Sequence, residues 1–324
     1  MAEFTLIDAI GERCAVARDD VRLGIGDDAA LLAVPAGQAL AVSTDTLVAG
    51  VHFPQSTKAY DVGWKSLAVN LSDLAAMGAT PAWATLALTL PTAERTWVEA
   101  FADGFAALAR EFKLALVGGD TTQGPLSITV TVHGFVPEHA AVRRAGAHPG
   151  DVVCVTGTLG DAAAGLRQLL VGDGAAEHRN PSAPDFLEVR LNRPTPRVPQ
   201  GLVLRGRASA CIDVSDGLVA DLGHICAASG VGAELDAPAL PASPALLALA
   251  DDTERRLLQL AGGDDYELCF TVAETEAPLL LADLARSGCA ATRVGRIVAG
   301  TDVVVYDAQR KPISLPRRGW EHFA

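Results

Sequence analysis

The chain has 324 residues, 49% of them hydrophobic, and a formal net charge of -13. This length and apolar content allow a sizeable core and indicate two domains rather than one. The acidic balance argues against nucleic acid as the main partner, because a phosphate backbone needs clustered Lys and Arg. No stretch approaches the ~20 apolar residues of a membrane span, and the amino terminus lacks the apolar run of a signal peptide. The six cysteines are scattered without a C-x-x-C pair, so reduced thiols in a soluble, cytoplasmic protein are expected.

The first half of the chain alternates between helical and strand-like patterns. Residues 3–18 predict a short amphipathic helix, because apolar side chains recur there on one helical face. Longer helical patterns cover residues 60–77 and 93–112. Strand-like runs lie at residues 39–43, 82–90, 114–117 and 127–136. This alternation predicts an α/β or α+β layer architecture rather than a helix bundle.

Proline and glycine gather between residues 136 and 150, which predicts a domain boundary there. We therefore expect one domain at residues 1–137 and a second at residues 150–324. The second opens with a strand, a glycine turn and a helix, followed by an Asn- and Pro-rich connector at residues 192–199. The remaining expected elements are strands at 209–214, 266–272 and 303–306, a helix at 217–229 and a Pro- and Ala-rich loop near 237–244.

Five short clusters of glycine and aspartate recur along the chain, and most of them end an apolar run. They are GIGDD (24–28), STDT (43–46), GGDTT (118–122), DVSDG (213–217) and GGDDYE (262–267). A carboxylate at the end of a buried strand is costly unless something compensates its charge. Lys and Arg number only 26 against 39 acids, so divalent cations such as Mg²⁺ or Mn²⁺ are the expected partners. The clusters predict a multi-metal phosphate site.

GIGDD also has a simpler interpretation, as a turn of glycine and aspartate. GIGDDAA fails as a dinucleotide fingerprint, because Ala29 replaces the third glycine. In the helix at 60–77, Ser66, Asn70 and Asp73 form a polar stripe among small apolar neighbours, which predicts a buried Asp73 that needs a cation.

The DVSDG cluster lies at a predicted strand-to-helix junction, followed by Asp221 in the helix. Ser215 or Asp216 could simply cap the helix, and a helix amino terminus also attracts phosphate. A cap and a metal ligand do not exclude each other.

Seven motifs, in order from Gly24 to the terminal GWEHF, together resemble the thiamine-monophosphate kinase family of the aminoimidazole ribonucleotide synthetase superfamily. They are GIGDDAALL, STDTLVAGVHF, VNLSDLAAMGATP, GGDTTQGPLSITV, VTGTLGDAAAGL, DVSDGLVADLGHI and GGDDYELCF. The resemblance implies two α/β domains, with mixed sheets covered by helices, and a homodimer formed through the amino-terminal sheets. It implies ATP-dependent phosphorylation of thiamine monophosphate to thiamine diphosphate with several Mg²⁺ ions, and neither nucleic acid nor a membrane as a partner.

The same resemblance assigns roles to single residues. The implied metal ligands are Asp28, Ser43, Thr44, Asp45, Asp73, Asp120, Asp213 and Asp216. The implied ATP contacts are Gly119, Asp120, Arg144 and Ser215, and the implied thiamine-phosphate contacts are His52, Asp264 and Trp320. The family pattern has Glu where this chain has Asp264, one methylene shorter, which leaves room for a water-mediated contact. The RPTPR segment at 193–197 also matches the family but receives no role.

The chemistry agrees with these roles. A phosphate acceptor with a second pKa near ~6 is mostly dianionic at neutral pH and needs no general base. Direct in-line transfer of the γ-phosphoryl group and stacking of Trp320 on the cationic substrate are therefore expected. Three alternatives stay open: a metal-dependent phosphohydrolase, another ATP-using member of the superfamily, and a non-enzymatic binder of divalent metals.

Overall fold

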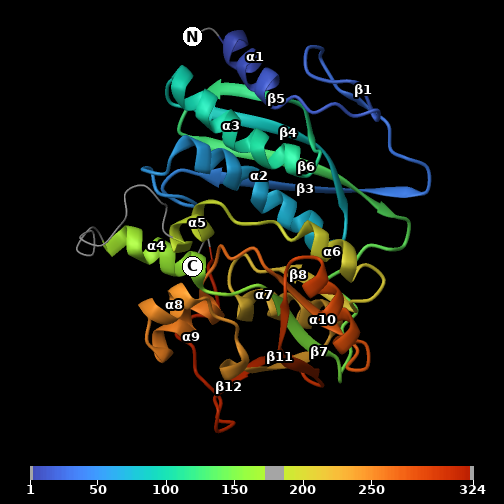
Figure 1. The fold of residues 1–324 in the computed structure, drawn as a ribbon, viewed down its shortest axis with the longest axis vertical. Helices are drawn as coiled ribbons and strands as arrows, with labels where there is room; N and C mark the ends of the chain where they lie inside the picture. The colour runs from blue at the N-terminus through green and yellow to red at the C-terminus, as the bar shows by residue number, and fades with distance from the viewer. Residues whose placement is uncertain (1–2, 172–185, 322–324) are drawn as a thin grey trace. The chain divides into compact units, whose positions relative to one another are not determined.

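The computed structural model describes residues 3–171 and 186–321 (Figure 1). These residues form two compact units. Unit 1 comprises the chain up to residue 74 together with residues 79–140, and unit 2 comprises residues 75–78 and the chain from 141 onward. The predicted architecture of mixed sheets flanked by helices is confirmed. No described helix is long and apolar enough to cross a membrane.

Unit 1 is built on a four-stranded sheet with the order β3-β6-β4-β5. The strands are β3 (Gln38–Val48), β4 (Thr80–Leu90), β5 (Ala115–Gln123) and β6 (Ser127–Pro137). Pairs β3–β6 and β4–β6 are antiparallel, whereas β4–β5 is parallel. The parallel pair needs a crossover, which helix α3 (Arg95–Glu111) provides.

The helices of unit 1 pack closely. Helix α2 (Ala59–Ala76) is buried on almost every side, as its alanine-rich sequence predicts. It meets α3 at two glycines: a Cβ on Gly63 would lie 2.0 Å from the Phe101 carbonyl oxygen, and one on Gly104 would lie 1.9 Å from that of Tyr60. Helix α1 (Glu3–Arg13) and the small β1 (Val21–Leu23) and β2 (Leu31–Leu32) pair complete the unit.

One face of this sheet stays open. Along β6, Ile128, Val130 and Val132 are buried, while the alternating threonines are partly exposed. The threonines pair across the strands through hydroxyl hydrogen bonds, Thr44 with Thr131 at 2.9 Å and Thr46 with Thr129 at 2.8 Å. Leu40 and Val42 of β3 are 42% and 54% exposed. Unit 1 therefore carries a threonine-rich face with apolar side chains that water reaches.

Unit 2 is built on a six-stranded sheet with the order β12-β9-β11-β7-β10-β8. Its strands are β7 (Val152–Thr156), β8 (Ala210–Asp213), β9 (Gly232–Asp236), β10 (Leu268–Val272), β11 (Ala291–Val298) and β12 (Val303–Tyr306). All neighbours are antiparallel except β9 and β12. Every residue of β7 and β10 is buried, as expected for central strands of a covered sheet.

The helices of unit 2 are mostly short. They are α4 (Asp161–Val171), α5 (Phe186–Asn192), α6 (Val198–Leu204), α7 (Leu218–Ser229), the 3-10 turn η2 (Ala237–Ala239), α8 (Pro244–Leu249), α9 (Asp252–Ala261) and α10 (Ala277–Arg286). Strands β9 and β11 were not among the elements predicted from the sequence, and only a loop was predicted where η2 lies and α8 begins.

The structure also corrects the position of two clusters. STDT and GGDTT do not end their strands, because β3 continues to Val48 and β5 to Gln123. Asp213, by contrast, is the last residue of β8, and GGDDYE leads into β10.

Candidate functional site

Three candidate ligands of unit 1 meet where β3 faces α2. The Ser43 hydroxyl donates to Asp73 Oδ2 at 2.5 Å. Asp45 lies two residues further along β3 and so projects to the same face as Ser43. Asp73 is half-buried rather than fully buried, because it lies at this junction and not inside the helix packing. Hydroxyl and carboxylate oxygens are thus gathered at one place in unit 1.

Asn70 fixes this arrangement, although sequence reasoning gave it no role beyond the polar stripe. Its side-chain oxygen accepts from the Asp45 N–H at 3.1 Å, and its side-chain nitrogen donates to the Ser66 carbonyl oxygen at 3.0 Å. Asn70 is completely buried. The stripe on α2 therefore joins the helix to the strand that carries Asp45.

Thr44 and Asp28 lie elsewhere in unit 1. The hydroxyl of Thr44 lies on the open face of the sheet, where it bonds to Thr131. The side chain of Thr44 therefore points away from the face that carries Ser43 and Asp45. Asp28 lies in the exposed turn between β1 and β2, and its N–H bonds to the Asp27 carboxylate at 2.9 Å.

His52 lies just beyond the end of β3, whereas Gly119 and Asp120 lie within β5. His52 follows β3, and its Nδ1 accepts from the Val48 N–H at 3.0 Å. Gly119 lies where β5 closes on β4, and a Cβ there would lie 1.9 Å from the Leu86 carbonyl oxygen. The exposed Asp120 follows it on β5. Strands β3 and β5 are the two edges of the sheet, so Asp45 and Asp120 are separated by three strand spacings, roughly 14 Å.

In unit 2, two loops carry most of the candidates and are joined through their backbones. The Asp264 N–H donates to the Ser215 carbonyl oxygen at 2.8 Å, which extends the β8–β10 pairing beyond both strands. The Trp320 N–H donates to the Asp216 carbonyl oxygen at 3.0 Å. The structure thus brings together Asp213, Ser215, Asp216, Asp264 and Trp320.

Glycines make this approach of the two loops possible. A Cβ on Gly263 would lie 2.5 Å from the Ser215 carbonyl oxygen, and Gly217, with φ +125°, would collide with Ala261. In the same loop Asp264 and Tyr266 have positive φ values of 68° and 49°. Such left-handed backbone in non-glycine residues is concentrated at functional sites. Gly217 and Gly263, in turn, are needed because the backbones of the two loops approach each other so closely.

Asp221 accepts three hydrogen bonds from the DVSDG loop. The N–H groups of Ser215, Asp216 and Gly217 all donate to its Oδ2 at 3.1 Å. Burial, and then the neighbouring Asp216, raise the pKa of Asp221 to about 7, against the three N–H donors that favour its charged form. The expected caps are absent: Gly217 is the N-cap of α7, and no side chain caps it. The capping interpretation of Ser215 and Asp216 was wrong.

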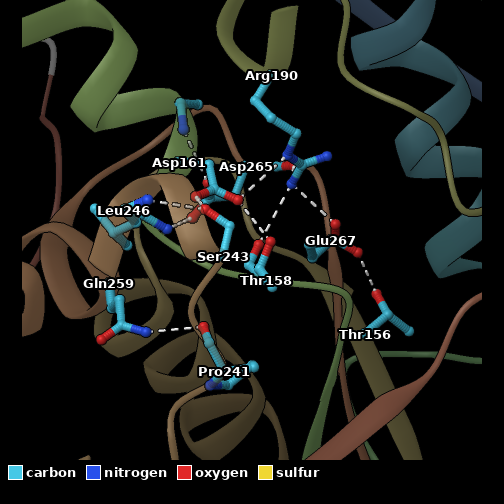
Figure 2. A network of polar contacts seen from close by, with 12 residues as sticks. Thr156, Thr158, Asp161, Arg190, Pro241, Ser243, Leu246, Gln259, Asp265 and Glu267 are labelled. Carbon is cyan, nitrogen blue, oxygen red and sulfur yellow. Dashed lines mark hydrogen bonds and ion pairs between the residues drawn. The ribbon is translucent and has the colours of Figure 1, made fainter. Parts of the chain in front are cut away.

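A buried polar network holds the GGDDYE loop (Figure 2). Arg190 donates to Glu267 Oε1 at 2.9 Å, and Arg197 binds both Glu267 oxygens at 2.6 Å. Gly157 leaves room for that carboxylate, since a Cβ there would lie 2.3 Å from Oε1. Asp265 accepts from the Gly160 N–H at 2.7 Å. The VTGTLGD and RPTPR motifs thus support the loop that carries Asp264.

Arg144 does not join this group directly. Its carbonyl oxygen accepts from the Ser229 hydroxyl at 3.3 Å, at the carboxyl end of α7, whereas Ser215 and Asp216 precede the amino end. Its side chain is exposed. Of the terminal GWEHF motif, His322 and Phe323 lie outside the described residues.

The donor chemistry fits Mg²⁺. Each unit offers a pair of carboxylates, Asp45 with Asp73 and Asp213 with Asp216, and hydroxyls accompany both pairs. In the described parts of the chain no three His, Cys, Asp or Glu side chains are arranged to hold a metal. Mg²⁺ keeps several waters and commonly uses one or two carboxylates plus substrate phosphates. The pairs therefore suit an ion that arrives with a nucleotide better than one held in a protein cage.

Family models match both halves of the chain: the AIR synthase related protein N-terminal domain at residues 26–136 and the C-terminal domain at residues 148–308. The thiamine-monophosphate kinase of Escherichia coli is 48% identical, covering 99% of this chain and 98% of that protein. The chain belongs to the thiamine-monophosphate kinase family.

Solved structures of this family agree with the fold. Thiamine-monophosphate kinase from Stenotrophomonas maltophilia superposes with a TM-score of 0.87 at 54% identity, over 94% of this chain and 96% of that one. The structure of AaThiL complexed with AMPPCP and TMP has a TM-score of 0.77 at 33% identity, over 99% and 97% of the two chains. The family resemblance predicted from the motifs is confirmed.

Proposed function

We propose that this protein transfers the γ-phosphoryl group of ATP to thiamine monophosphate, giving thiamine diphosphate and ADP. The observation that carries the proposal is family membership along the whole chain, at 48% identity to thiamine-monophosphate kinases. The AaThiL structure supports it, because that relative holds AMPPCP and TMP together. The paired carboxylates of both units provide the oxygen-rich surroundings that a transfer between two phosphate groups needs.

We further propose that several Mg²⁺ ions take part. Ser43, Asp45 and Asp73 would hold metal in unit 1, and Asp213 and Asp216 in unit 2. Bound Mg²⁺ would offset the repulsion between the triphosphate and the acceptor phosphate. The chain's own part is to fix these oxygens, through Asn70 in unit 1 and the joined loops in unit 2.

We propose direct in-line transfer without a phospho-enzyme. The dianionic acceptor needs no base, and the His52 Nδ1 is already engaged by the Val48 N–H. Transfer to thiamine monophosphate from ATP that is chiral and isotopically labelled at the γ-phosphorus should invert the configuration. Retention would indicate a double displacement and refute direct transfer.

We propose a homodimer in which a second copy covers the open face of the unit 1 sheet. Leu40 and Val42 make that face partly apolar. Asp45 and Asp120 lie on opposite sheet edges, β3 and β5, too far apart for one small metal site in one chain. If β3 of one copy lay beside β5 of the other, the strands that carry these two carboxylates would be neighbours. We also propose a cytoplasmic location, supported by six buried, free cysteine thiols.

The test is a product assay with ATP, Mg²⁺ and thiamine monophosphate. Wild type should form thiamine diphosphate and ADP in equal amounts, and EDTA should abolish both. Asp45→Asn should lose the activity, whereas Asp8→Asn, on the exposed side of α1, should keep it. ADP and free phosphate without thiamine diphosphate would favour the phosphohydrolase alternative.

A further inference from the structure

The DVSDG loop uses its backbone hydrogen-bonding groups entirely inside unit 2. The N–H of Val214 donates to the Glu267 carbonyl oxygen at 2.7 Å, and the next three N–H groups donate to Asp221. The carbonyl oxygens of Val214, Ser215, Asp216 and Gly217 accept from the N–H groups of Tyr266, Asp264, Trp320 and Asp221 at 2.8, 2.8, 3.0 and 3.0 Å. Every backbone N–H and C=O of residues 214–217 has a partner within unit 2, so none of the loop's N–H groups is left to donate to a ligand.

The three N–H groups that converge on Asp221 form the kind of backbone concavity that binds phosphate at a helix amino terminus. Here the anion is supplied by the chain itself. Asp221 lies in the first turn of α7 and is 2% exposed. A phosphate cannot bind these three N–H groups while Asp221 occupies them.

We propose that Asp221 is a positioning residue for the reaction: its carboxylate fixes the DVSDG loop so that the side chains of Asp213, Ser215 and Asp216 face the Mg²⁺ and ATP. The proposal rests on the proposed function. Its physical basis is that without Asp221 three neighbouring N–H groups, one buried and two partly buried, would lose their shared acceptor, which is costly. The loop would then rearrange to satisfy them, and displacements of about 1 Å at such a site can cost about 100-fold in rate.

One oxygen of Asp221 accepts all three bonds, and this gives a sharp conservative variant. In Asp221→Asn the amide oxygen can occupy the position of Oδ2 and accept the same bonds without the charge. Asp221→Ala removes the acceptor. The matched control is Asp251→Ala, because Asp251 Oδ1 accepts from the Thr253 and Glu254 N–H groups at 2.9 Å at the start of α9, away from the loop.

The first measurement is hydrogen exchange by mass spectrometry on the segment 213–221, which requires no activity. Asp221→Ala should lose protection at the amides of residues 215–217, and Asp221→Asn and Asp251→Ala should keep it. Unchanged protection in Asp221→Ala would overturn the proposal, because another group would then hold the loop. This result stands even if wild type proves to have no activity on thiamine monophosphate.

The second measurement is calorimetric binding of Mg²⁺ with AMPPCP, followed by steady-state kinetics. Asp221→Ala should weaken binding and lower kcat/KM for ATP by about 100-fold, while Asp221→Asn should recover most of the loss. Asp251→Ala should lower the Tm without changing either quantity. An Asp221→Ala variant within threefold of wild type would overturn the proposal. So would an Asp221→Asn variant that is folded and protected but as impaired as Asp221→Ala. If Asp221→Ala does not fold, Asp221→Asn alone is compared with wild type. It should keep most of the binding and of kcat/KM, and a loss of about 100-fold in the folded, protected variant would overturn the proposal.

Discussion

Trp320 is placed by its backbone rather than by burial of its ring. Its N–H is bonded to the Asp216 carbonyl oxygen at 3.0 Å, and its side chain is 48% exposed. The adjoining Gly319 allows this, since a Cβ there would lie 2.8 Å from the same Asp216 oxygen. A large exposed aromatic face beside a proposed metal ligand is well suited to a cationic, aromatic substrate.

Trp320→Ala should therefore raise the KM for thiamine monophosphate by about tenfold, with little change in the KM for ATP, because only the cationic substrate gains from stacking. Steady-state kinetics with each substrate varied in turn would measure this. Trp320→Phe is the control and should keep most of the affinity. Equal increases in both KM values would show that the residue supports the loop and not the substrate.

At the scale of elements, the loops of unit 2 depend on a buried ionic network. Glu267 is completely buried and is bound by Arg190 and Arg197. Removing one partner of such a group leaves the others with uncompensated charge, which is more damaging than loss of a surface pair. The network ties the segment after β7 and the segment before α6 to the start of β10.

Glu267→Gln should accordingly lower the free energy of unfolding by about 3 kcal/mol. Its matched control is Glu274→Gln, which removes the exposed pair with Arg293 and should cost less than about 1 kcal/mol. Urea unfolding would compare them. Equal small losses would mean that Arg190 and Arg197 find other acceptors.

Asp265 predicts a pH dependence of stability. Burial raises its pKa to about 8, although Arg190 opposes the shift. Between its ordinary pKa near ~3.9 and this value, the folded protein holds a proton that the unfolded chain has released, so stability falls as pH rises. Raising the pH from about 5.5 to about 7.5 should therefore lower the free energy of unfolding of wild type by about 2 kcal/mol more than that of Asp265→Asn. Asp221 titrates in both proteins, so the difference isolates Asp265, and parallel pH profiles would contradict the prediction.

At the scale of the whole molecule, the proposed dimer makes a shared site testable. Asp45→Asn and Asp120→Asn should each be inactive as homodimers. If each site takes Asp45 from one copy and Asp120 from the other, a mixed dimer has one site with both changes and one intact site. Mixed dimers isolated with two different tags should then recover about half of wild-type activity. Inactive mixed dimers would show that each chain forms its own site, and a monomer in solution would refute the dimer.

The long periodic elements of this protein could be predicted from local pattern. The helix patterns at residues 60–77 and 93–112 match α2 and α3 within two residues, and the run at 303–306 coincides with β12. Strands β9 and β11 were missed, because a five-residue strand such as β9 carries little periodicity of its own. The short polar clusters were placed at strand ends, yet STDT lies within β3, where pairing with β6 continues through the polar residues.

The sequence by itself determined the family, since the order of seven motifs is a property of the chain, and it determined which oxygen-bearing side chains are available for metal and phosphate. Only the tertiary structure decided how they are held. Whether Ser43 or Thr44 faces α2 depends on strand register, and whether the amides of DVSDG bind phosphate or Asp221 depends on where one carboxylate of α7 points. The separation of Asp45 from Asp120 depends on the strand order. Strand register, strand order and the orientation of a single side chain are set by tertiary packing, and local periodicity contains no information on them.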